Sequence, residues 1–237
     1  METFVLVHGA CHTGESWREV TRILEAKGHR VYTPTAGGNQ PGADKQVTLQ
    51  QVYQPIVDLI EKKDLHDVIL LGHSLGGTTI QFVAQAIPQR IKRLVFMGAL
   101  VLEDQKPILE TFPELQVFFE TSEIDEEKGT ILFSFPIWRE VFMNDVDLQT
   151  AQRIYKQLTP NPINYIMDKV DLQKFYTLQI SKSYLHGTED AIVPYRIYEK
   201  TAKLLGIHRF VQYEGSHEIM YSNPQEIAKK ILVAGRD

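Results

Sequence analysis

The 237-residue chain is predicted to fold as an α/β protein with a mainly parallel sheet, helices on both faces and a mostly helical cap insertion. Short apolar runs alternate with helical patterns, which is typical of βαβ units in a parallel sheet. This alternation stops between residues 102 and 180, a stretch too long for a structureless loop in a compact domain. We therefore expect a core domain made of 1–101 and 181–237, and a helical cap made of 102–180.

Six buried strands are expected because six short segments are rich in Val, Ile, Leu and Phe without polar alternation. They are Phe4–Val7, Arg30–Thr33, Val68–Leu71, Leu94–Met97, Ser183–His186 and Phe210–Tyr213. Helices are expected near 15–27, 48–63, 76–87, 195–205 and 224–233. Pro55 lies inside the second of these and should kink that helix or delay its start.

The insertion is expected to contain helices over 147–158 and 162–175 and an acidic surface stretch over 120–128. Eleven of the chain's 23 aromatic residues lie in it: Phe112, Phe118, Phe119, Phe133, Phe135, Trp138, Phe142, Tyr155, Tyr165, Phe175 and Tyr176. We interpret the insertion as a cap over the carboxyl ends of the strands, with most rings packing and a few lining a pocket. In the alternative, the rings only form the core of a satellite subdomain.

The composition argues against several classes of partner and cofactor. A formal net charge of −5 and a pI near 5.9 give no electrostatic footprint for nucleic acid or an anionic membrane. No apolar run has the length of a membrane span and the first residues lack signal-peptide features, so a cytoplasmic location is expected. Neither a phosphate-binding glycine motif nor metal-ligand spacing is found, so no cofactor and no metal are expected. The oligomeric state is left open, a homodimer included.

The segment 72–76 reads Gly-His-Ser-Leu-Gly and matches the nucleophile-elbow pattern Gly-x-Ser-x-Gly. It follows the apolar run 68–71 and precedes a helical pattern, which is the context that this elbow requires. The sharp turn crowds the serine, and Gly72 and Gly76 remove the Cβ atoms that would clash. The pattern predicts Ser74 as a nucleophile, the alternative being a chance match in a glycine-rich turn.

A serine nucleophile needs a general base, and the base needs an acid to orient it. In chains with this elbow, the acid and the histidine follow the serine in that order. Asp190 comes just after a predicted strand, and His217 lies between the last strand and the last helix. Both therefore occupy loops at the carboxyl edge of the sheet, where ligands bind. We predict His217 as the base and Asp190 as the acid, with Glu189 as the rival of Asp190.

The other seven histidines are weaker candidates for the base. Four flank motif positions and are expected to shape or line the site: His8, His12, His73 and His186. Three are expected at strand edges or on the surface: His29, His66 and His208.

The loop after the first strand contains Gly9 and Ala10 and is the predicted source of an oxyanion hole. In this fold, a backbone N–H from that loop acts with the N–H of the residue after the nucleophile. These donors would be Ala10 and Leu75, although an ordinary βα turn uses His-Gly just as readily. Cys11, the only cysteine, cannot form an internal disulfide and is expected to be a small buried residue rather than a nucleophile.

Together these residues resemble the α/β-hydrolase branch that contains plant methyl-ester esterases and hydroxynitrile lyases. The similarity runs through residues 4–12 with Trp17, residues 24–31, the elbow, the 188–190 turn and the His217 loop before residues 222–224. It covers both ends of the chain well and the insertion only loosely, around 158–160. The resemblance implies a carboxylic-ester hydrolase for small or medium, often aromatic, substrates.

Three positions separate the two chemistries of that branch. The lyases resemble a pattern with threonine in the oxyanion loop, cysteine after the nucleophile and lysine after the catalytic histidine. This chain has Gly9, Leu75 and Glu218 at those places, so the resemblance implies hydrolysis rather than lyase activity. Glu218 also departs from the esterases, which carry an apolar residue there. Beside the base it would raise the pKa of His217 or disfavour acidic substrates, unless it points to solvent.

The favoured function is hydrolysis of small to medium, apolar or aromatic carboxylic esters through an acyl-enzyme on Ser74. One alternative is a cofactor-free oxygenase of the same fold, in which a His/Asp pair deprotonates a heteroaromatic substrate and Glu103 or Asp104 serves as the acid. Another is a ligand-binding protein derived from the fold, since a fold alone does not fix function.

Overall fold

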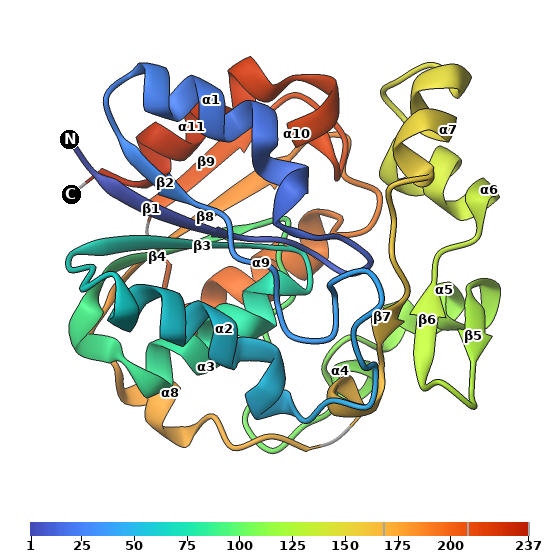
Figure 1. Ribbon diagram of the computed structural model, residues 1–237, viewed down its shortest axis with the longest axis horizontal. Coiled ribbons are helices and arrows are strands. Elements are labelled where there is room, and N and C mark those ends of the chain that lie inside the picture. Colours follow the sequence, from blue (N-terminus) through green and yellow to red (C-terminus); the bar gives the residue numbers. More distant parts are fainter. Residues whose placement is uncertain (168, 208, 237) are drawn as a thin grey trace.

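The computed structural model describes residues 1–237 except Asp168, His208 and Asp237. In this described chain, six parallel strands form one sheet in the order β2-β1-β3-β4-β8-β9 (Figure 1). Their bounds are β1 Thr3–Val7, β2 Arg30–Tyr32, β3 Val68–His73, β4 Ile91–Met97, β8 Ser181–Gly187 and β9 Arg209–Tyr213. Each predicted strand overlaps one of these, and the predicted α/β fold with a mainly parallel sheet is confirmed.

Both faces of the sheet are buried, as the unbroken apolar strand sequences predict. Because side chains alternate along a strand, Phe4 and Leu6 join one core while Val5 and Val7 join the other. The first core is closed by α1 Arg18–Ala26, α10 Ile219–Ser222 and α11 Pro224–Ala234. The second is closed by α2 Leu49–Lys62, α3 Gly76–Ala86 and α9 Tyr195–Leu205. The sheet is therefore a rigid layer that fixes the loops at its carboxyl edge.

The helix α2 begins at Leu49, ahead of Pro55. Of the two effects expected of this proline, a kink or a delayed start, the delayed start is therefore wrong. Thr48 and Gln51 form a capping box in which the Thr48 hydroxyl accepts from the Gln51 N–H at 3.2 Å and the Gln51 side chain accepts from the Thr48 N–H at 2.8 Å. This box satisfies two of the backbone N–H groups at the helix start. The helix then continues through Pro55 to Lys62.

Most of the segment between β4 and β8 lies beyond the carboxyl ends of the strands, on the right of Figure 1, whereas its last helix lies at the lower left, beside α3. Its helical elements are short: α4 Ile108–Thr111, η3 Pro113–Leu115, α5 Gln116–Thr121, α6 Phe135–Ile137, the π-helical turn η4 Trp138–Phe142, α7 Leu148–Tyr155, η5 Asn164–Ile166 and α8 Gln173–Thr177. A three-stranded antiparallel sheet, which the sequence did not predict, joins β5 Glu123–Asp125, β6 Thr130–Leu132 and β7 Asn161–Pro162. We call the segment 102–180 the cap.

The helix predicted over 162–175 is wrong. Outside Asp168, which lies beyond the described residues, this stretch contains the end of β7, the turn η5 and the start of α8. The side chain of Asn161 accepts hydrogen bonds from the Cys11 N–H at 3.3 Å and from Asn39 at 2.8 Å. These long-range bonds, with the pairing to β6, override the local helical pattern, because helix propensity is only a weak preference.

The remaining expectations for this part of the chain fare better. The helix expected over 147–158 is present as α7, which the side chain of Asp147 caps by accepting from the Thr150 N–H at 2.8 Å. Most residues of the acidic stretch 120–128 are exposed. Within the described residues, no helix has the length and apolar character needed to cross a membrane.

The capping box predicts that Thr48→Ala lowers the free energy of unfolding by about 1 kcal/mol, because the Gln51 N–H loses its acceptor. Urea denaturation followed by circular dichroism measures this change. Thr48→Ser is the matched control, because it keeps the accepting hydroxyl. Equal stability of the alanine variant and the wild-type chain would mean that the box adds nothing.

Candidate active site

Ser74 lies in the turn between β3 and α3 and has a backbone φ of 52°, in the left-handed region that a serine rarely adopts. A Cβ on Gly72 would lie 2.4 Å from the Gly76 carbonyl oxygen, and a Cβ on Gly76 would lie 2.5 Å from the His8 carbonyl oxygen. Both positions therefore require glycine. The Ser74 N–H donates to the Met97 carbonyl at 3.0 Å, which helps to hold the strained turn in place.

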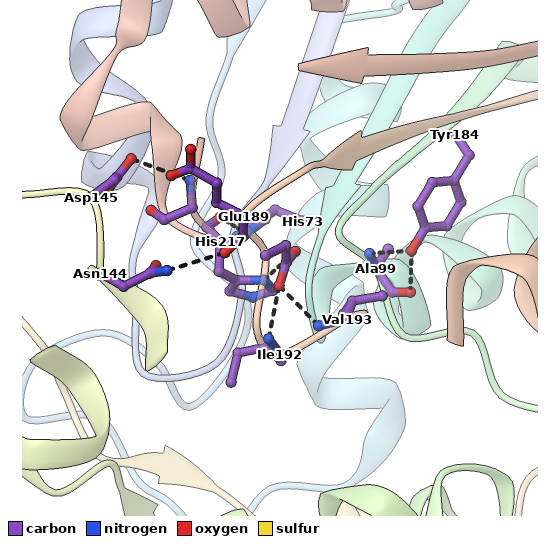
Figure 2. A network of polar contacts seen from close by, with 11 residues as sticks. His73, Ala99, Asn144, Asp145, Tyr184, Glu189, Ile192, Val193 and His217 are labelled. Carbon is purple, nitrogen blue, oxygen red and sulfur yellow. Dashed lines mark hydrogen bonds and ion pairs between the residues drawn. The ribbon is translucent and has the colours of Figure 1, made fainter. Parts of the chain in front are cut away.

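Asp190 and His217 meet in the loops that follow β8 and β9. Nδ1 of His217 lies 2.8 Å from Oδ2 of Asp190, and both side chains are fully buried. Oδ1 of Asp190 accepts from the N–H groups of Ile192 and Val193, each at 2.9 Å, and Figure 2 shows both pointing at this carboxylate. Both oxygens of the Asp190 carboxylate thus accept hydrogen bonds.

The structure separates Asp190 from the other carboxylates considered for the same role. Glu189 is exposed to solvent. Glu103 forms ion pairs with Lys106 at 2.7 Å and Lys200 at 3.1 Å. Asp104 accepts a hydrogen bond from the Leu172 N–H at 2.7 Å. The acid that contacts His217 is Asp190.

The contacts of His217 fix which ring nitrogen carries a proton. A carboxylate only accepts, so Nδ1 donates to Asp190 and Nε2 of the neutral ring is left as an acceptor. Among the described residues, Nε2 has no hydrogen-bond partner, so no such bond joins it to Ser74. Burial by itself would lower the pKa of His217, but the charge of the neighbouring Asp190 and its hydrogen bond to Nδ1 raise that pKa.

The cap holds the loop that carries His217. Oδ2 of Asp145 accepts from the Ser216 N–H at 3.2 Å and from the Ser222 hydroxyl at 2.6 Å. The ring of Phe142 packs edge-on against His217 with centroids 5.4 Å apart. Asn144 donates to the Glu189 carbonyl at 3.2 Å, as Figure 2 shows. Sequence reasoning missed Asp145 and Asn144, because no motif or spacing links them to His217, and it named Phe142 only as one of the cap aromatics.

The loop after β1 packs tightly against the elbow. A Cβ on Gly9 would lie 2.9 Å from Cβ of Ser74, so only glycine fits there. His8 donates from Nδ1 to the Gly9 carbonyl at 2.8 Å and accepts at Nε2 from the Ala36 N–H at 3.0 Å. The Gly9 carbonyl and the Ala10 N–H belong to one peptide plane, so His8 orients that N–H. Burial lowers the pKa of His8 to about 4, which keeps its ring neutral.

A small apolar cavity of about 60 Å³ lies at Ser74. Ala10 and Leu75, the two residues predicted to supply an oxyanion hole, border it together with Ser74. Leu75 is the N-cap residue of α3, so no preceding helical turn offers a carbonyl to its N–H. The structure therefore brings the nucleophile candidate and both backbone candidates to one cavity.

The cap aromatics divide into two groups, as the sequence analysis expected. Four line the cavity, beside Ile108, Leu115 and Ile131: Phe118, Phe119, Phe133 and Phe142. Others are core residues: Trp138 is fully buried and donates to the Ala151 carbonyl at 3.1 Å, and Phe175 is fully buried under α3. The four pocket-lining rings come from residues 118–142 of the cap.

Asn161 and Cys11 connect the cap to the loop after β1. Asn161 borders the cavity and accepts from the Cys11 N–H, and sequence reasoning missed it because an asparagine in a predicted loop has no distinctive signal. Burial raises the pKa of the Cys11 thiol to about 12, and its sulfur donates to the Ile131 carbonyl at 3.4 Å. Because the thiolate is the reactive form, this raised pKa disfavours Cys11 as a nucleophile at neutral pH.

Of the remaining histidines, His29, His66 and His186 lie outside the cavity lining. His186 stacks against Tyr198, and Nδ1 of His29 accepts from the Glu2 N–H at 3.2 Å. His66 is exposed and pairs with Asp64 at 3.1 Å. His208 lies outside the described residues.

Three potential metal ligands lie together, although no spacing in the sequence indicates them. The ligand atoms of His73, His217 and Glu218 are within 4.8 Å of one another. Hydrogen bonds already engage one nitrogen of each ring, since His73 donates from Nε2 to the His217 carbonyl at 3.0 Å and His217 donates to Asp190. We do not assign a metal to this group.

Comparison with known proteins agrees with this geometry. The chain is 28% identical to the carbendazim hydrolyzing esterase of Nocardioides sp. (strain SG-4G), with 99% of this chain and 100% of that protein covered. It is 26% identical to salicylic acid-binding protein 2 of Nicotiana tabacum, with 97% and 95% covered. A solved extracellular alpha/beta-hydrolase from a Paenibacillus species, described as sharing structural and functional homology with the tobacco protein, is 40% identical, with both chains fully covered and a TM-score of 0.93.

These similarities confirm the expected resemblance to the plant branch, and the names of the relatives support a hydrolase. A family model described as alpha/beta hydrolase fold matches residues 2–224. The chain therefore belongs to the alpha/beta hydrolase family.

Proposed function

We propose that the protein hydrolyses carboxylic esters through an acyl-enzyme on Ser74, with His217 as general base and Asp190 as the acid that orients it. The observation that carries this proposal is the buried Asp190–His217 hydrogen bond of 2.8 Å beside a left-handed serine that borders an apolar cavity. The esterases among the relatives support the same reaction class.

The hydrogen bonds of His217 support the role that the proposal gives to each group. Asp190 holds Nδ1–H of His217, so the free Nε2 takes the proton of Ser74 as its oxygen attacks the ester carbonyl. The imidazolium formed lies against the Asp190 carboxylate, which stabilises its charge. The N–H groups of Ala10 and Leu75 bind the developing oxyanion. His217 then protonates the leaving alcohol, and water releases the acid by the reverse sequence.

The cavity favours a small apolar acyl group. Its lining is almost entirely aliphatic and aromatic, and its volume is only about 60 Å³. This narrows the expected acyl group, because aryl and medium-chain groups need more room than a cavity of this volume offers. Phe118 and Phe119 are half-buried, so their movement is the simplest way to admit a larger group.

The assignment of the nucleophile predicts that Ser74→Ala lowers kcat for p-nitrophenyl butanoate by roughly 10³-fold or more, because only binding and the oxyanion donors remain. A fluorophosphonate probe should label the wild-type chain and not this variant. Cys11→Ala is the matched control and should still be labelled. Hydrolysis by Ser74→Ala at near wild-type rate would exclude covalent serine catalysis and favour a role for the His/Asp pair alone.

The assignment of the acid predicts that Asp190→Asn lowers kcat by on the order of 10²–10⁴-fold, because the amide no longer selects the correct tautomer of His217. Steady-state kinetics with the same ester measures the loss. Glu189→Gln is the matched control on the adjacent, exposed residue and should stay within about threefold of the wild-type rate. A larger loss in Glu189→Gln than in Asp190→Asn would reverse the assignment.

The cavity predicts that kcat/KM rises by at least about tenfold from acetate to butanoate esters, since each buried methylene contributes about 0.8 kcal/mol. It should then fall at octanoate. Phe118→Ala should move the optimum to longer chains, whereas Phe135→Ala, a cap ring outside the cavity lining, should not. A flat profile across the series in all three chains would show that the cavity does not receive the acyl group.

A further inference from the structure

Glu218 is a buried carboxyl group to which the proposed reaction gives no role. It directly follows His217, is 2% exposed, and its backbone N–H donates to the Phe142 carbonyl at 3.3 Å. The sequence left open whether this side chain points to solvent, and the structure places it inside. A carboxylate without hydrogen-bond donors in such a place is costly, so a buried carboxyl is paired or protonated.

The side chain that faces Glu218 is His12, from the loop after β1. Nδ1 of His12 lies 2.7 Å from the Ala10 carbonyl oxygen, which can only accept. Nδ1 therefore carries the proton, and Nε2 of the neutral ring is a bare acceptor. This Nε2 lies 3.6 Å from Oε2 of Glu218, and neither atom has a hydrogen-bond partner among the described residues.

An ionised Glu218 would thus place a carboxylate oxygen against a lone pair, deep inside the protein. One proton on either side removes the repulsion. Burial lowers the pKa of His12 to about 3 and raises the pKa of Glu218 to about 8, so the proton belongs to the carboxyl group. At neutral pH the pair is then a neutral acid facing a neutral imidazole.

The other titratable groups around Glu218 favour the same state. Asp190 and Asp145 are acidic and disfavour a further negative charge, whereas His217 is the basic neighbour that opposes them. Four more groups that lie close to or interact with Glu218 are neutral at pH 7, because burial raises the pKa of the tyrosines and the thiol and lowers that of the histidine: Tyr213, Tyr221, Cys11 and His73.

We propose that Glu218 is a positioning residue, held as a neutral carboxylic acid, whose O–H faces His12 and couples the His217 loop to the oxyanion loop. The inference rests on the proposed function of Ala10 and Ser74. The connection runs from Glu218 to Nε2 of His12, and from Nδ1 of His12 to the Ala10 carbonyl. When the proton leaves, repulsion acts on His12, and a negative charge appears near the place where the oxyanion forms.

This arrangement predicts an alkaline loss of activity that depends on Glu218. Because the pKa of Glu218 is raised, the proton is present at neutral pH and is lost as pH rises through about 8. In the wild-type chain, kcat/KM for p-nitrophenyl butanoate should fall by about tenfold per pH unit above that point. In Glu218→Gln, whose amide N–H faces His12 at every pH, the ratio of kcat/KM at about pH 9.5 to that at about pH 7.5 should stay near one.

The matched control is Glu214→Gln, which removes an exposed carboxylate from the same loop and should keep the alkaline fall. A purely structural role for Glu218 would change kcat/KM by the same factor at every pH and leave the shape of the profile unaltered. The same alkaline fall in Glu218→Gln as in the wild-type chain would overturn the proposal.

A second measurement needs no turnover. Infrared difference spectroscopy between about pH 7 and pH 10 should show the carbonyl stretch of a protonated carboxylic acid that disappears on titration, and this signal should be absent in Glu218→Gln. No such signal in the wild-type chain would mean that Glu218 is already ionised at neutral pH, which overturns the proposal. If the signal is present but Ser74→Ala hydrolyses esters at the wild-type rate, the proposed function fails while the protonation of Glu218 stands.

Discussion

The turn at Ser74 is compressed between two neighbouring loops of the sheet, and the arrangement of the site follows from that compression. On one side lie the His8 carbonyl and Gly9; on the other, the Ser74 carbonyl accepts from the Leu100 N–H at 3.0 Å in the loop after β4. The parallel sheet brings these loops to one edge, because all its strands end there. Gly9 and Gly76 have no side chains, so the backbone of the loop after β1 can approach the turn closely. The Ser74 side chain borders the cavity.

The same burial that fixes the geometry also sorts the histidines by charge. His8, His12 and His73 are buried without a carboxylate hydrogen bond, so desolvation lowers the pKa of each ring. His217 is buried as deeply but contacts Asp190, and its pKa is raised instead. Asp190 therefore distinguishes His217, the ring that accepts a proton in the proposed reaction, from the other three. His8, His12 and His73 stay neutral and hydrogen-bond to backbone carbonyls.

The core and the elbow could be predicted from the sequence because their signals are local. Apolar runs mark the strands, and the steric demand of the turn appears directly as Gly72 and Gly76. The order of serine, acid and histidine along the chain was enough to predict Asp190 and His217 as the other site residues. Asp145 and Asn161 carried no such signal, because their roles depend on contacts with loops 71 and 150 residues away. The burial of Glu218 could not be predicted from the sequence either, because it depends on how the cap packs against the His217 loop.

The cap supplies hydrogen bonds that hold the groups proposed to react, so it is more than a cover over the cavity. Asp145 anchors the backbone around His217, and Asn161 anchors the backbone beside Ala10. Swinging the cap away would release both anchors together and loosen the base and the oxyanion loop at once. In the proposed reaction, the cavity wall and the supports of the reacting groups therefore belong to the same segment of the chain. Related proteins should therefore change their substrate range by replacing single side chains along the cavity wall. Exchanging the whole cap would remove the hydrogen bonds of Asp145 and Asn161, on which the proposed reaction depends.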